Sequence, residues 1–214
     1  MPMRKNMAGL LFVLGCAAVM TPGAVSAQEQ EPAENPAVSA VVAAEPQKFV
    51  VYDDKDSAWN HYSPSEKIAD ASALEIDDGC AENPQSGKTC IKVQYNATGG
   101  FGWAGLYWVN PKGNWGNEKG GYDLRSAKKL TFWVRGEKGG EHVAVFKFGG
   151  LKGVYPDSDN HGMGPVVLTD QWQQLTVDVS TRNMSYISAG FSFALTKAHN
   201  RKGCVFYLDN IQYE

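Results

Sequence analysis

The residue types best suited to binding chemistry gather in one aromatic segment. Residues 103–115 hold three of the six tryptophans, interleaved with glycine and asparagine, and Tyr107 and Asn110 lie in the same stretch. A flat aromatic ring can stack on the apolar C–H face of a sugar while amides and charged groups hydrogen-bond its hydroxyls. The segment therefore indicates a carbohydrate-binding surface.

The spacing of these aromatic residues divides them between two sides of a strand. Trp103 and Tyr107 share one parity, and the opposite parity is shared by Ala104, Leu106 and Trp108. Successive side chains of a strand point to opposite faces, so one set is expected in the core and the other at the surface or a cleft. Trp115 follows a proline and a glycine and is expected on a loop, where a ligand could cover it.

A second set of binding residues is expected on the strand at 130–135. Trp133 and Arg135 lie opposite the apolar parity of Leu130, Phe132 and Val134, and Lys147 has the same relation to its own strand. These three side chains could form the floor of a cleft. The alternative is a solvated sheet face whose long cations cover apolar surface.

Asp157 and Asp159 alternate in the loop 155–162, which also contains His161. Their oxygens could contact sugar hydroxyls or hold Ca²⁺, although the glutamate of an EF-hand is missing. An ordinary turn rich in aspartate and asparagine is the other interpretation.

A structural Ca²⁺ is also predicted where the chain ends meet. Asp53 and Asp54 follow the first expected strand, and Asp209 lies in the last. If those two strands are neighbours, the three carboxylates could share one ion. The alternative is that Asp53 and Asp54 cap a turn and Asp209 is hydrogen-bonded at a bulge.

The cysteines suggest an oxidising compartment. Cys80 and Cys90 bracket a loop whose Asn-Pro and Ser-Gly pairs let its ends meet, so a disulfide is predicted between them. Metal binding is the alternative, but no histidine or second cysteine pair has ligand spacing nearby. Cys204 is expected to be a buried, inert thiol.

The N-terminal segment resembles an export signal. Residues 1–27 contain no Asp or Glu, two basic residues precede an apolar run over 7–20, and Val-Ser-Ala ends the segment. The run is too short to span a membrane. The alternative is a lipoprotein signal, in which Cys16 would carry a lipid anchor. Residues 28–47, rich in Ala, Glu and Pro, are expected to be a disordered linker.

Residues 48–214 are expected to form one folded domain. Short runs of alternating apolar and polar residues recur between glycine pairs, and no segment shows a helical period over three turns. The predicted fold is all-β, a two-sheet antiparallel jelly-roll sandwich. The net charge of −3 leaves no positive field for nucleic acid, so no nucleic-acid partner is expected.

Catalytic motifs are not found in the sequence. It contains no GxSxG, HExxH or P-loop motif, and its four histidines show no ligand spacing. Acidic pairs exist, but a sequence does not place two carboxyls across a sugar. Whether the chain is an enzyme stays open at this stage, and a protein without catalysis is favoured.

Five segments together resemble exported bacterial jelly-roll domains of the carbohydrate-binding-module type, in the galactose-binding-like superfamily. They are Ser86–Val93, Trp103–Trp108, Gly121–Leu124, Leu130–Gly136 and Phe206–Ile211. The resemblance implies a β-sandwich that often binds glycans and often carries a structural Ca²⁺ near the chain ends, with Asp209 as the matching ligand position. After Pro64-Ser65 such domains carry a Gly-Trp-Met-Gly-like stretch. This chain has Glu-Lys-Ile-Ala there and lacks that tryptophan.

The leading hypothesis is an exported, non-catalytic module that binds a polysaccharide or a cell-envelope glycan, in the periplasm, in the medium or on the cell surface. Its predicted ligand-binding residues are Trp103, Tyr107, Asn110, Trp115, Trp133, Arg135, Asp157 and Asp159. One alternative is an envelope scaffold whose sandwich face binds another protein. Another is a small glycan-active hydrolase or lyase. The oligomeric state is not predicted.

Overall fold

The structure, a computed structural model, describes residues 48–214, so the predicted signal (1–27), its Cys16 and the linker (28–47) lie outside the described residues. The described part consists of thirteen β-strands and one 3₁₀ turn, η1 (Ala71–Ala73). No helix within it is long and apolar enough to cross a membrane. The all-β prediction is confirmed.

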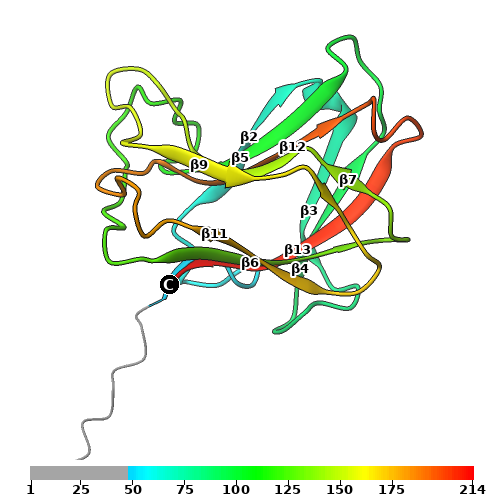
Figure 1. Cartoon of the computed structure of the whole chain (residues 1–214), viewed down its shortest axis with the longest axis horizontal. Helices are drawn as coiled ribbons and strands as arrows, with labels where there is room; N and C mark the ends of the chain where they lie inside the picture. The colour runs from blue at the N-terminus through cyan, green and yellow to red at the C-terminus, as the bar shows by residue number, and fades with distance from the viewer. Residues whose placement is uncertain (1–47) are drawn as a thin grey trace, which may run out of the picture. The chain divides into compact units, whose positions relative to one another are not determined.

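Two antiparallel sheets pack face to face as a sandwich (Figure 1). The first, called sheet A, has the order β11-β6-β13-β4-β3, and β1 adds to β13. The first and last strands are therefore neighbours, as expected. The strands of sheet A are β1 (Phe49–Tyr52), β3 (Leu74–Cys80), β4 (Cys90–Tyr95), β6 (Lys129–Gly136), β11 (Gln173–Asp178) and β13 (Cys204–Tyr213).

The second sheet, called sheet B, has the order β2-β5-β12-β8-β9. Its strands are β2 (Ser63–Ala69), β5 (Trp103–Val109), β8 (Val145–Gly149), β9 (Asn160–Met163) and β12 (Ala189–Thr196). A separate two-stranded ribbon joins β7 (His142–Val143) and β10 (Val166–Val167). His161 was expected on a loop but belongs to β9, where it pairs with Phe148 of β8.

The core lies between the sheets and follows the period-two patterns of the sequence. Phe132 of sheet A packs edge-on against Phe191 of sheet B, with ring centroids 5.0 Å apart, and Trp108 is fully buried beside Phe191 at 5.3 Å. Aromatic pairs of this kind stabilise a core by about 0.5–1.5 kcal/mol beyond the area that they bury. Because these side chains fill the space between the sheets, the alternate residues of each strand lie on the outer face, where a ligand could bind.

Candidate functional site

The outer face of sheet B carries a row of cross-strand neighbours that crosses all five strands, and the strand β9 contributes only a glycine to it. On β5 the core takes Ala104, Leu106 and Trp108, so Tyr107 points outward, as the parity predicts. Strand register places Tyr107 beside Ser192 of β12, and Ser192 beside Lys147 of β8. The complete row is Glu66, Tyr107, Ser192, Lys147 and Gly162.

An aromatic pair with a cation forms the centre of this row. The rings of Tyr107 and Trp115 meet edge-on with centroids 6.0 Å apart, and the Lys147 ammonium lies 5.3 Å from the Tyr107 centroid. Tyr107 is 9% exposed, whereas Trp115 is 40% exposed. Trp115 therefore offers the accessible ring, and Tyr107 supports it from below. We call Trp103, Tyr107, Trp115 and Lys147 the aromatic face.

Trp115 is held by the buried side chain of Asn114. The Asn114 amide donates to the carbonyl oxygens of Asn110 and Glu118, both at 3.0 Å. Its oxygen accepts the N–H groups of Gly116 at 2.8 Å and Glu118 at 3.2 Å. Four bonds from one side chain fix the loop that presents the tryptophan. The sequence analysis did not identify Asn114, because nothing local distinguishes it from the other asparagines nearby.

Two neighbours complete this loop. Gly116 has a φ of +87°, and a Cβ there would lie 2.0 Å from the carbonyl oxygen of Lys152, so only glycine allows the two loops to touch. The Asn110 amide donates to the Gly120 carbonyl at 2.8 Å and closes the loop base. Asn110, predicted to contact ligand, lies beside the aromatic face and positions the loop.

Trp103 marks the other end of the aromatic face. It is 38% exposed and pairs with Thr196 at the end of β12. Four residues of strand separate it from Tyr107, about 13 Å at the usual rise. Just before it, Phe101 is 75% exposed, and the buried Asp70 carboxylate accepts the N–H groups of Phe101 and Gly102 at 3.1 and 2.8 Å. The sequence analysis did not single out Phe101 as a candidate.

Asp157 and Asp159 hold loops next to this face. Asp157 accepts the N–H groups of Leu151 at 2.9 Å and of Ser188 and Ala189 at the start of β12. Burial raises the pKa of this carboxyl, and the three N–H donors oppose the rise. Asp159 accepts the N–H of Asn183 at 3.1 Å. Their contacts fit the alternative of a structured, aspartate-rich turn.

Trp133 and Arg135 lie on the outer face of sheet A, so the structure does not bring them together with Lys147. The Arg135 guanidinium lies 3.7 Å from the Tyr207 ring centroid and 5.2 Å from that of Trp172. It also donates to the Glu82 carbonyl at 3.0 Å, in the loop that follows β3. Protein groups already surround this cation.

The aspartates predicted to hold calcium anchor the same region of sheet A. Asp209 is fully buried and accepts the N–H groups of Gln85 at 2.8 Å and Ser86 at 3.3 Å. Burial raises its pKa to about 6, although these N–H donors lower it.

Asp54 accepts the N–H groups of Lys88 at 2.8 Å and Thr89 at 2.7 Å. The N–H of Asp53 donates to the Asn60 side chain at 3.0 Å. Within residues 48–214 no three His, Cys, Asp or Glu side chains group as a metal site. The groups that face Asp54 and Asp209 are N–H donors and, at Asp54, the Thr89 hydroxyl at 3.1 Å; N–H donors suit carboxylates and not a cation. A structural Ca²⁺ stays a prediction.

The predicted disulfide is not formed in the structure. Cys80 and Cys90 are cross-strand partners of β3 and β4, yet both are free, as is Cys204. The Cys90 thiol donates to the Cys80 carbonyl oxygen at 3.5 Å instead of meeting the other sulfur. Burial raises the pKa of Cys90 to about 12, and that of Cys204 likewise to about 12, so both are protonated thiols at neutral pH.

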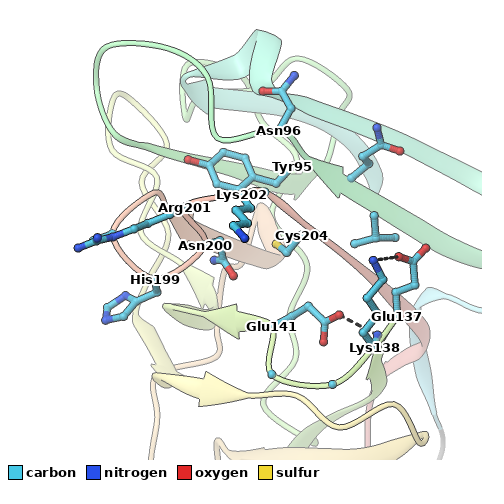
Figure 2. A pocket seen from close by; sticks show the side chains of 16 residues that line it. Tyr95, Asn96, Glu137, Lys138, Glu141, His199, Asn200, Arg201, Lys202 and Cys204 are labelled. Carbon is cyan, nitrogen blue, oxygen red and sulfur yellow. Dashed lines mark hydrogen bonds and ion pairs between the residues drawn. The ribbon is translucent and has the colours of Figure 1, made fainter.

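A separate cavity of about 900 Å³ opens at one end of the sandwich (Figure 2). Tyr95, Glu141, Asn200 and Cys204 are among its lining residues. The Asn200 amide is already used: its oxygen accepts the His142 N–H at 3.1 Å, and its nitrogen donates to the His142 carbonyl at 2.8 Å. None of the side chains predicted to bind ligand lines this cavity.

Comparison with known proteins supports the fold. No protein-family model and no curated protein matches the chain. A crystal structure of a family 30 carbohydrate-binding module is 16% identical with a TM-score of 0.52, and covers 78% of this chain and 98% of its own. A family 11 module from Clostridium thermocellum, solved with a β-1,3-1,4-mixed-linked tetrasaccharide, is 14% identical with a TM-score of 0.49 and covers 78% and 94%.

A mutant of a family 29 carbohydrate-binding module is 8% identical, with a TM-score of 0.48 and coverage of 78% and 91%. The two packed antiparallel sheets and the family 30 match, with its TM-score of 0.52, confirm the predicted sandwich of the carbohydrate-binding-module type as a fold. At these identities the similarity concerns the fold alone, so the function is argued from the side chains.

Proposed function

We propose that this protein is an exported, non-catalytic module that binds a polysaccharide or cell-envelope glycan on the aromatic face. One observation carries the proposal: the buried Asn114 holds the loop of Trp115, whose partly exposed ring is supported edge-on by Tyr107, and the Lys147 ammonium lies over that tyrosine. A loop that fixes a half-exposed indole through four side-chain bonds is a preorganised surface for a ligand.

The chemistry of the face suits a sugar chain. An indole covers the apolar side of a pyranose ring, while the ammonium and nearby backbone groups hydrogen-bond its hydroxyls. Trp103 lies about 13 Å along β5 from Tyr107, which gives an extended glycan a second stacking point on the same side of the sheet. The fold shared with solved carbohydrate-binding modules supports this use of the surface.

The exported setting rests on residues 1–27, whose sequence resembles a signal peptide, with residues 28–47 as the tether. In the lipoprotein alternative, Cys16 would tie the same domain to a membrane surface. The absence of catalysis in the proposal is supported by Asp157, a carboxylate predicted to contact ligand, because its oxygens accept three backbone N–H groups instead. Incubation with bound glycans should release no reducing ends or unsaturated products.

Affinity electrophoresis through a panel of soluble polysaccharides tests the proposal. A double Trp103→Ala, Trp115→Ala variant should lose retention, whereas Trp59→Ala should keep it. Trp59 is the matched control because it is 69% exposed and lies outside the aromatic face. Circular dichroism would establish that each variant is folded. Unchanged retention of the double variant would refute the site. A folded natural protein that binds no glycan would favour the protein-interaction alternative.

A further inference from the structure

Lys147 has no salt-bridge partner in the described part of the chain. Lys55, Lys92 and Lys129 each lie within salt-bridge distance of a carboxylate, at 3.4, 3.0 and 2.8 Å. Among residues 48–214, no carboxylate oxygen lies within 4.0 Å of the Lys147 ammonium, which lies instead over the Tyr107 ring. It is half-buried, so its position is fixed by packing.

Two further lysines are near in the fold, Lys119 in the Trp115 loop itself and Lys152 in the loop that touches it. The backbone of Lys152 touches Gly116, the residue after Trp115. The Lys119 ammonium lies 5.9 Å from the Tyr155 ring, and the N–H of Tyr155 donates to the Gly116 carbonyl at 2.8 Å. Both side chains are exposed, and neither pairs with a carboxylate in the described part of the chain.

Three carboxylates lie in the same region as these lysines. Asp157 keeps its negative charge while it accepts backbone N–H groups, and the Lys147 ammonium is close enough to oppose the rise of its pKa that burial causes. Glu66 pairs across the strands with Tyr107, and Glu118 lies in the exposed part of the Trp115 loop. Lys147, Lys119 and Lys152 are thus matched in number by Asp157, Glu66 and Glu118, so the region has no excess of positive charge. Lys147 differs from the other two lysines because it is half-buried over Tyr107, the ring that supports Trp115, with no carboxylate oxygen within 4.0 Å. An ammonium held in this place can meet an anionic group of a ligand that stacks on the indole.

We propose that the aromatic face binds an acidic glycan, in which a sugar ring stacks on Trp115 and its carboxylate or sulfate group meets the Lys147 ammonium. The inference rests on the proposed function and names its ligand class. A uronic acid and a sulfate ester present the same anionic oxygens to a lysine. Glu66, the cross-strand neighbour of Tyr107, opposes this attraction.

Titration calorimetry with four soluble polymers tests this inference: polygalacturonate, dextran sulfate, unmodified dextran and a neutral mixed-linkage β-glucan. The natural protein should bind polygalacturonate or dextran sulfate at least tenfold more tightly than both neutral polymers. The preferred one of the two identifies carboxylate or sulfate as the recognised group. Binding should weaken as salt rises from 50 to 500 mM, because the contact is ionic.

Variants separate a specific contact from diffuse attraction. Lys147→Met keeps the apolar stem and should lose about tenfold or more in affinity for the acidic polymer, the usual size of one charge-assisted bond. Lys128→Met, the control at an exposed lysine outside the aromatic face, should bind as the natural protein does. Trp115→Ala should lose binding as well, because the proposed contact also needs the sugar ring to stack on the indole. Glu66→Gln should bind two- to threefold more tightly.

Three outcomes overturn the inference. Equal affinity for neutral and acidic polymers, unchanged affinity of Lys147→Met, or an equal loss in Lys128→Met would each show that Lys147 does not select an anion. In the first of these cases the proposed glycan-binding function stands. If none of the four polymers nor any glycan of the wider panel binds, the proposed function itself fails.

Discussion

The outer faces of the two sheets carry the same kinds of side chain and differ in what covers them. On sheet A, Arg135 lies between Tyr207 and Trp172, and the loop after β3 closes over it through Glu82. The Tyr207 hydroxyl also donates to the Glu82 carboxylate at 2.9 Å. On sheet B, Lys147 lies over Tyr107, the Tyr107 ring meets Trp115 edge-on, and the indole is 40% exposed. The loop after β3 therefore covers the aromatic and cationic groups of sheet A, whereas those of sheet B stay accessible to a ligand.

This difference shows that an aromatic residue beside a cation is not by itself a binding site. On sheet A the loop 81–89 supplies the partners that a ligand would supply, so the cluster stabilises the fold. On sheet B the loops hold Trp115 from behind and leave its accessible side without a protein partner group. The predictions below test whether the first face serves stability and the second serves binding.

The largest expected effect is that of Asn114→Ala. This change leaves buried carbonyl and N–H groups of the Trp115 loop without partners, so the free energy of unfolding should fall by about 3 kcal/mol. Glycan retention should fall too, because the loop no longer fixes the indole. Urea unfolding and affinity electrophoresis measure the two effects. A variant of natural stability with full retention would show that the loop needs no such anchor.

Arg135→Ala should lower the stability of the protein without changing its glycan binding. Removal of the guanidinium takes away its stacking on Tyr207 and Trp172 and its bond to the Glu82 carbonyl, and should cost about 2 kcal/mol of stability. Glycan binding should not change, because Arg135 lies on the opposite side of the sandwich. Chemical denaturation and the glycan panel measure this. A loss of binding in a folded protein would mean that sheet A contributes to the site.

A smaller, pH-dependent effect is expected at Asp209. Its folded pKa of about 6 lies above the usual value for aspartate, since burial disfavours the charged form. A carboxyl with a raised pKa contributes stability below its unfolded pKa and loses it as pH rises through the folded pKa. The stability advantage of the natural protein over Asp209→Asn should therefore shrink between pH 4 and 7, by on the order of 1 kcal/mol. A constant difference across that range would contradict the raised pKa.

Local sequence patterns predicted much of the fold. The alternation at 130–134 identified β6 and its inward face, and the spacing of Trp103 and Tyr107 identified the outward face of β5. β2 was not predicted, because its sequence SPSEKIA has little apolar alternation. Its place is set by pairing with β5.

The assembly of the site could not be predicted from the sequence. Tyr107 and Lys147 meet only because β12 lies between β5 and β8, an order that depends on long-range strand pairing. For the same reason Trp133 and Lys147, which share a local pattern, lie on opposite sides of the sandwich. The cover over Arg135 likewise comes from a loop more than 40 residues away in sequence.

Amide chemical-shift mapping tests the central claim most directly. The ¹⁵N-labelled protein is titrated with an oligosaccharide of whichever glycan it retains, and the shifts are assigned to residues. The account predicts that the largest shifts cluster in residues 103–119 and 145–153, around Trp115 and Lys147, with none on β6. Shifts centred on Trp133, Arg135 and Trp172 instead would place binding on sheet A and contradict the account.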